Sequence, residues 1–273
     1  DREEIIILEG IRGRAYPAHI ASYFSTQTAE TLSQYHFETA PDLTLEGIID
    51  NRDGKRSRFT STFQSSAPAN FILFERDLSI IEPEGTVKIS GDLVELDITG
   101  KLFGGQAEYI GSIKMANEGN SISGHFKAEK INFAPMASLY GVDDENTEGT
   151  LACELHFDIP ASSPDKWTAK ATTTISNADI FSMPFMGKIS RQINANLATR
   201  TASLPFLISS VLDAKQTVNS SQGASINATF QNEGNGILQL TNFKGVAPGF
   251  TLQANGEINT LKTNDQLNIK AEM

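Results

Sequence analysis

The sequence predicts an all-β protein: a long, curved, groove-like antiparallel meander sheet with a few short helices. Two observations predict this fold. From residue 42 onward apolar and polar residues alternate with a period of two, and glycine-containing turn signals separate the alternating segments at short intervals. A strand, a tight turn and the next strand, repeated many times, are typical of a meander and not of βαβ units.

Residues 1–36 are expected to form an N-terminal strand and an amphipathic helix. The apolar run at 5–8 predicts the strand, and the fixed φ of Pro17 suits the first turn of the helix. Apolar residues at roughly helical spacing then predict a helix over 18–36: Ile20, Phe24, Leu32 and Tyr35. Two interpretations remain open for this helix, packing on the adjacent sheet and contact with a membrane or a partner.

Residues 37–273 are expected to form one repetitive antiparallel β domain. Alternation places Val94, Leu96 and Ile98 on one face of a strand. The strongest run puts five residues on the apolar face of another strand: Leu151, Cys153, Leu155, Phe157 and Ile159. A later strand carries Phe250 and Leu252 in the same pattern. Hairpin turns are predicted at Asp53-Gly54, Gly104-Gly105 and Asn235-Gly236, because glycine supplies the positive φ that tight turns need.

Two segments interrupt the alternation within residues 176–215. Residues 181–196 and 204–215 are apolar and predict short helices, each too short to span a bilayer. We expect them to cover an edge or an end of the sheet.

Composition excludes some classes of partner. The formal net charge of −11 disfavours a nucleic acid and also a polybasic contact with anionic lipid headgroups. Lipid would therefore have to be bound through apolar surface. Phe (16) far outnumbers Trp (1), which suits a dry interior or an apolar groove better than a carbohydrate platform.

The ends of the sequence indicate a piece of a longer protein. It opens on Asp1 without an initiator Met or a signal peptide, and it stops directly after a strand-like run. No stretch approaches the ~20 apolar residues of a membrane span. We therefore expect a membrane anchor to lie outside this chain.

No catalytic, cofactor-binding or metal site is expected from the sequence. His19, His36, His125 and His156 show no paired spacing, and period-2 geometry puts Cys153 and His156 on opposite faces of their strand, which argues against zinc. Cys153, the lone cysteine, is interpreted as a small buried hydrophobe.

Two charged clusters each leave two interpretations open. The first cluster, Asp143, Asp144 and Glu145, suits a solvated turn or a hard divalent cation, although it lacks the spacing of an EF-hand loop. The second is basic and suits a charged hairpin tip or a phosphate contact: Arg52, Lys55, Arg56 and Arg58.

Several segments resemble AsmA-like proteins of diderm bacteria. The resemblance rests on a strand ending in Phe103-Gly104-Gly105, a strand followed by a small helix at 129–141, and the Gly149 to Ile159 strand. Its most specific stretch begins with SNADIFSMPFMGKISRQI at 176–193, and closing strands follow over 224–273. The resemblance covers roughly residues 17–273. The chain departs from the family pattern by lacking the N-terminal membrane helix.

The resemblance implies a periplasm-facing protein anchored in the inner membrane, which handles phospholipid or serves outer-membrane assembly. Function is then expected to be non-catalytic and to use apolar rows on a concave sheet face. The lipid-contact candidates are Val94, Leu96, Ile98, Leu155, Phe157, Phe250 and Leu252. The alternative is an extracellular or periplasmic β domain that binds a protein partner at a strand edge. A β-rich enzyme is disfavoured because the sequence does not point to the pair of carboxylates that glycoside hydrolysis needs.

Overall fold

The structure of the chain is a computed structural model. It describes residues 5–22, 29, 33, 36–50, 56–73, 76–116, 119–139, 148–161, 163, 166–177, 224–234, 237–247, 250–259 and 266–272. The chain forms two compact units, which are described separately below. The first unit comprises Asp1–Glu129 and Glu154–Ala169, and the second comprises Lys130–Cys153 and Lys170–Met273.

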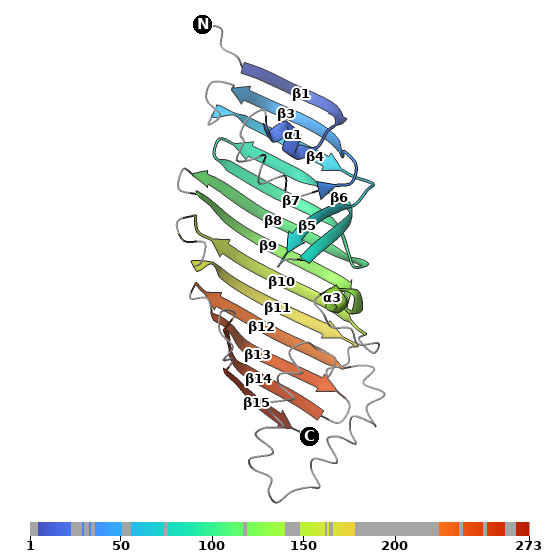
Figure 1. Cartoon of the computed structure of the whole chain (residues 1–273), viewed down its shortest axis with the longest axis vertical. Helices are drawn as coiled ribbons and strands as arrows, with labels where there is room; N and C mark the ends of the chain where they lie inside the picture. Colours follow the sequence, from blue (N-terminus) through green and yellow to red (C-terminus); the bar gives the residue numbers. More distant parts are fainter. Residues whose placement is uncertain are drawn as a thin grey trace, which may run out of the picture. The chain divides into compact units, whose positions relative to one another are not determined.

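The fold class predicted from the sequence is confirmed. Apart from β2 and β5, the described strands belong to an antiparallel meander that is not closed, hydrogen-bonded in the order β1-β3-β4-β6-β7-β8-β9-β10-β11-β12-β13-β14-β15 (Figure 1). Two short helices accompany them in the described part of the chain: α1 (Pro17–Ser22) and α3 (Phe133–Leu139). The helices predicted within 176–215 lie outside the described residues.

The first unit contains the strands from the N-terminus to β8, together with most of β9 and part of β10 and β11. Their bounds are β1 (Ile5–Arg14), β2 (His36–Phe37), β3 (Asp42–Asp50), β4 (Arg58–Gln64), β5 (Ala69–Leu73), β6 (Arg76–Ser90), β7 (Leu93–Leu102), β8 (Gly105–Ala116), β9 (Gly119–Asn132), β10 (Thr150–Ile159) and β11 (Thr168–Ser176). A tight turn joins β7 to β8 as predicted, although its two residues are Phe103 and Gly104, since Gly105 already pairs with Leu102. The predicted N-terminal strand is longer than 5–8, and the predicted helix begins at Pro17.

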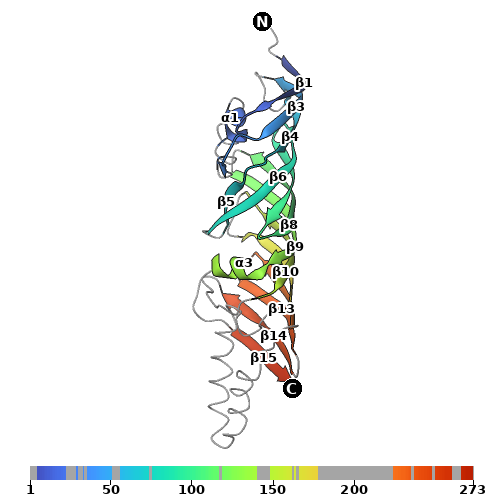
Figure 2. The ribbon, with the colours of Figure 1, turned by 90° about the vertical axis from the view of Figure 1, so that its right-hand side faces the viewer.

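Strand β6 belongs to two layers because it bends at Glu82 and Pro83. Glu82 has a φ of 52°, and a register shift separates Ile81 from Glu84 in the pairing with β7. Proline has no N–H to donate to the ladder, so a bulge is where it fits. Before the bend β6 pairs with β5, which also pairs with β2, and after the bend it joins the main sheet. Figure 2 shows β5 and α1 on the same side of the first unit's sheet.

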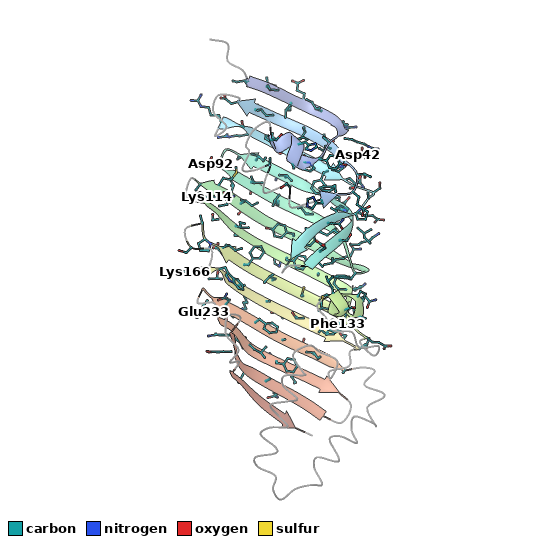
Figure 3. The ribbon with its side chains drawn as sticks, viewed as in Figure 1. Asp42, Asp92, Lys114, Phe133, Lys166 and Glu233 are labelled. Carbon is teal, nitrogen blue, oxygen red and sulfur yellow. The ribbon has the colours of Figure 1, made fainter. Side chains whose placement is uncertain are left out.

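Period-2 alternation gives the first unit one apolar and one polar face. The paired rows Ile89–Val94 and Val87–Leu96 lie on the apolar face, whereas Lys88–Glu95 and Thr86–Asp97 lie on the polar face. Asp42 lies at one end of the strands, and Asp92 and Lys114 lie at the other end (Figure 3).

The second unit has its own buried core. It contains β12 (Ser225–Glu233), β13 (Ile237–Ala247), β14 (Phe250–Asn259) and β15 (Gln266–Glu272), with α3 and the remaining parts of β9, β10 and β11. Ile226 and Phe243 are each 1% exposed. Ile131 near the end of β9 and Phe133 at the start of α3 are also buried. The Phe133 N–H donates to the carbonyl of Gly149 at 3.0 Å.

Candidate functional site

Three of the predicted lipid-contact residues meet in one cluster on the apolar face of the first unit. Val94 and Leu96 on β7 are 3% and 5% exposed and pack with the buried Ile113 of β8. Half-buried residues surround this core and continue the apolar face: Val87, Ile89, Ile98, Tyr109, Met115 and Ile122. We call these nine residues the apolar cluster. All come from neighbouring strands of one sheet face, which is why alternation alone could predict three of them.

An aromatic pair extends the apolar cluster toward β10. The rings of Tyr109 and Phe157 are stacked, with centroids 6.3 Å apart and 13° between the planes. Tyr109 lies across Gly111 and Gly124: a Cβ on Gly111 would meet the Tyr109 hydroxyl, and a Cβ on Gly124 would lie 2.6 Å from its Cε2 atom. Two glycines thus leave the space that lets the ring lie flat on the sheet.

The remaining predicted residues do not join the apolar cluster in the described structure. Leu155 shares the face of Phe157 on β10 and is half-buried. Phe250 and Leu252 belong to β14 of the second unit, and their side chains lie outside the described residues.

The hairpin of β5 and β6 covers one end of the apolar face. A Cβ on Gly100 of β7 would meet the Ile80 side chain, so the first half of β6 rests directly on β7. Phe37 of β2 meets Phe63 of β4 edge-to-face, with centroids 5.8 Å apart. This second layer explains why Phe63 is only 8% exposed on an otherwise open sheet.

The opposite, polar face of the first unit carries a depression of about 730 Å³. Four strands contribute threonines to it: Thr44, Thr62, Thr86 and Thr99. Its rim holds Arg14 and Asp42, whose Nε and Oδ1 atoms form an exposed ion pair at 2.8 Å. The hydrogen bond to Asp42 raises the pKa of Arg14 above its ordinary value. The depression is therefore lined mainly by polar residues, unlike the apolar groove expected from the sequence.

Sequence reasoning missed a convergence of two histidines and a glutamate on the polar face. His125 of β9 and His156 of β10 stack with ring centroids 4.1 Å apart, and both Nε2 atoms lie near Glu154 Oε1, at 3.0 and 3.3 Å. The hydrogen bonds from His156 and His125 lower the pKa of Glu154 below its ordinary value. The alternation predicts that Glu154 and His156 share the polar face of their strand. It does not predict that His125 of β9 lies beside them.

Other residues singled out in the sequence do not converge on a site. Cys153 is half-buried, and its odd position places it on the face opposite His156. Arg56, Arg58, His19 and His36 are exposed. The acidic cluster at 143–145, together with Arg52 and Lys55, lies outside the described residues.

Comparison with known proteins leaves the family open. No protein-family model matches the chain, and neither the characterised proteins nor the solved structures yield a match. In the described part of the chain, no helix is both long and apolar enough to cross a bilayer.

Proposed function

We propose that this chain is a non-catalytic, lipid-handling part of a bacterial envelope protein of the AsmA-like type. In this proposal, the apolar face of the first unit takes the acyl chains of a phospholipid. The full-length protein is anchored in the inner membrane, faces the periplasm and serves phospholipid transport or outer-membrane maintenance.

One observation carries the proposal. The apolar cluster and the Tyr109–Phe157 pair form a continuous apolar area on one face of an open sheet, while the other face is polar. Ile98 and Phe157 are half-buried, so they retain surface that an acyl chain can cover. A chain with a net charge of −11 repels an anionic lipid headgroup, so it would bind such a lipid through apolar surface that contacts the acyl chains.

The test is native mass spectrometry of the purified chain, followed by lipid extraction of the same sample. We expect stoichiometric phospholipid on the unmodified protein and its loss in Ile98→Glu and Phe157→Glu. The matched control is Ile110→Glu, since Ile110 is 46% exposed on the polar face of β8. Circular dichroism checks that each variant stays folded. A lipid-free mass for the unmodified protein, or equal lipid loss in Ile110→Glu, would contradict the proposal.

A second candidate function is binding of a protein partner at the edge strand β1. Ile5, Ile6, Ile7 and Ile11 are 44% to 63% exposed. Among the described strands β1 pairs only with β3, so one side of it offers backbone groups for strand addition.

A photo-reactive amino acid separates this candidate from the first. Placed at Ile7 in the full-length protein in cells, it is expected to cross-link one defined envelope protein; placed at Ile110, it is expected to give none. Lipid binding with no cross-link from position 7 would instead favour the lipid-handling function.

A further inference from the structure

The convergence of His125, Glu154 and His156 is produced by two neighbouring strands of the first unit. Glu154 and His156 are two residues apart on β10, so their side chains project from the same face. His125 comes from β9, which lies next to β10 in the sheet. The ligand atoms of the three side chains all lie within 4.8 Å of one another.

We propose that His125, Glu154 and His156 form a binding site for a divalent transition-metal ion, with Zn²⁺ as the best match. Two imidazole nitrogens and a carboxylate oxygen are ligands that zinc accepts, whereas Ca²⁺ and Mg²⁺ prefer oxygen alone. Copper(II) and nickel(II) also accept imidazole. The three protein ligands leave a fourth position to water.

The distances in the cluster suit such an ion. Ligand bonds of about 2.0–2.1 Å in a tetrahedron put neighbouring ligand atoms about 3.3 Å apart. The two Nε2 to Oε1 distances are 3.0 and 3.3 Å. The imidazole planes are within 2° of parallel, so the rings must tilt toward each other before both nitrogen lone pairs meet one ion. The side chains of His125, Glu154 and His156 are 32%, 52% and 58% exposed, which leaves room for that tilt.

Two charged side chains flank the site on the same face. Lys127, two residues from His125, forms an ion pair with Glu129 at 2.7 Å and is also attracted by the carboxylate of Glu154. Asp158, two residues beyond His156, is exposed on the same face of β10. Metal binding needs Glu154 as a carboxylate and both imidazoles with an unprotonated ligating nitrogen, so affinity is expected to fall as the pH is lowered.

A bound ion would fasten β9 to β10. Residues 133–149 connect these strands along the chain, so no tight turn holds His125 opposite Glu154. A metal that binds only the folded state raises the melting temperature by mass action. Zinc is therefore expected to stabilise the first unit as well as bind to it.

The test is isothermal titration calorimetry with zinc chloride at pH 7.5, on tag-free full chain stripped of metal by a chelator. We expect one zinc ion per chain and a rise in melting temperature. Each of His125→Gln, Glu154→Gln and His156→Gln is expected to weaken zinc binding about tenfold or more. Mutating a residue that only hydrogen-bonds to a metal ligand already lowers metal affinity about 10–100-fold. Circular dichroism checks the fold of these surface variants.

Matched controls use the other candidate ligands of the chain. His19→Gln and His36→Gln remove exposed histidines of the same unit and are expected to leave zinc affinity unchanged. Cys153→Ala is expected to bind as the unmodified chain does. Zinc binding that survives loss of the cluster residues, that disappears with Cys153, or that is absent from the unmodified chain would overturn the proposal. Electron paramagnetic resonance of bound copper(II) gives a separate readout, with coupling to two nitrogens expected and none in the double variant of His125 and His156.

Discussion

The ring of Tyr109 stacks on that of Phe157, 6.3 Å between centroids, and both rings lie over Gly124. Tyr109 is on β8 and Phe157 is on β10, with the glycine on β9 between them. Two large side chains thus cross a strand that contributes no side chain at that position. This arrangement ties three strands together on the face proposed to meet lipid.

A series of three glycine-to-alanine variants tests how much this close packing matters. A Cβ on Gly47, which has a φ of 135°, would lie 2.5 Å from the Phe59 Cα atom, and backbone cannot move aside cheaply. The atoms nearest to a Cβ on Gly124 belong to the ends of the Tyr109 and Phe157 side chains, whereas Gly13 has nothing within 4 Å. We expect Gly47→Ala to lower the free energy of unfolding most and Gly124→Ala to lower it by about 1–3 kcal/mol. Gly13→Ala is expected not to lower it. Urea denaturation measures the three values; an equal loss in Gly13→Ala would contradict the packing argument.

A second prediction concerns backbone strain at Lys130. This exposed residue of β9 has a φ of 56°, a region in which side chains other than glycine cost about 1–2 kcal/mol. Lys130→Gly is expected to raise the free energy of unfolding by about 1 kcal/mol. The control is Lys114→Gly on β8, an exposed lysine outside the positive-φ residues, which is expected to lower it by about 0.5–1 kcal/mol. Changes of the same sign in both variants would refute the assignment of strain.

Alternation predicted which residues share a face, but not which residues meet across strands. Val94, Leu96 and Ile98 met on the expected face because a period of two fixes the direction of each side chain. The bend of β6 at Glu82 depends on a bulge against β7, so a sequence reading of one strand at a time could not find it.

The His125 and His156 pair escaped prediction for a related reason. A tight hairpin turn sets the register of its two strands, as Phe103-Gly104 does for β7 and β8. Strands β9 and β10 are joined instead through α3 and residues beyond it. The register of β9 and β10 is therefore fixed by tertiary packing. Nothing in the sequence indicates that the rings of His125 and His156, which are 31 residues apart, would stack.

A third prediction follows from the lowered pKa of Glu154 in metal-free protein. The imidazoles of His156 and His125 donate hydrogen bonds to the carboxylate, which favours its ionised form. A folded-state pKa below the unfolded value gives stability that is present above about pH 4.3 and lost as pH falls through the folded pKa. Carbon-13 NMR of the side-chain carboxyls should show that the pKa of Glu154 lies below the ordinary value of a glutamate. In the double variant His125→Gln and His156→Gln its pKa should rise, and an unchanged pKa would show that the histidines are not its partners.

The last prediction compares a buried isoleucine with an exposed one. Ile131 is 1% exposed in the core of the second unit, and Ile110 is 46% exposed on the polar face of β8. Ile131→Ala leaves a cavity and loses buried apolar area, so we expect a loss of about 2–5 kcal/mol in the free energy of unfolding. Ile110→Ala is expected to stay within about 0.5 kcal/mol of the unmodified chain, as surface substitutions usually do. Urea denaturation followed by circular dichroism gives both values. A large loss at Ile110 would mean that the polar face is covered in solution, and it would direct the search for a partner to that face rather than to the edge of β1.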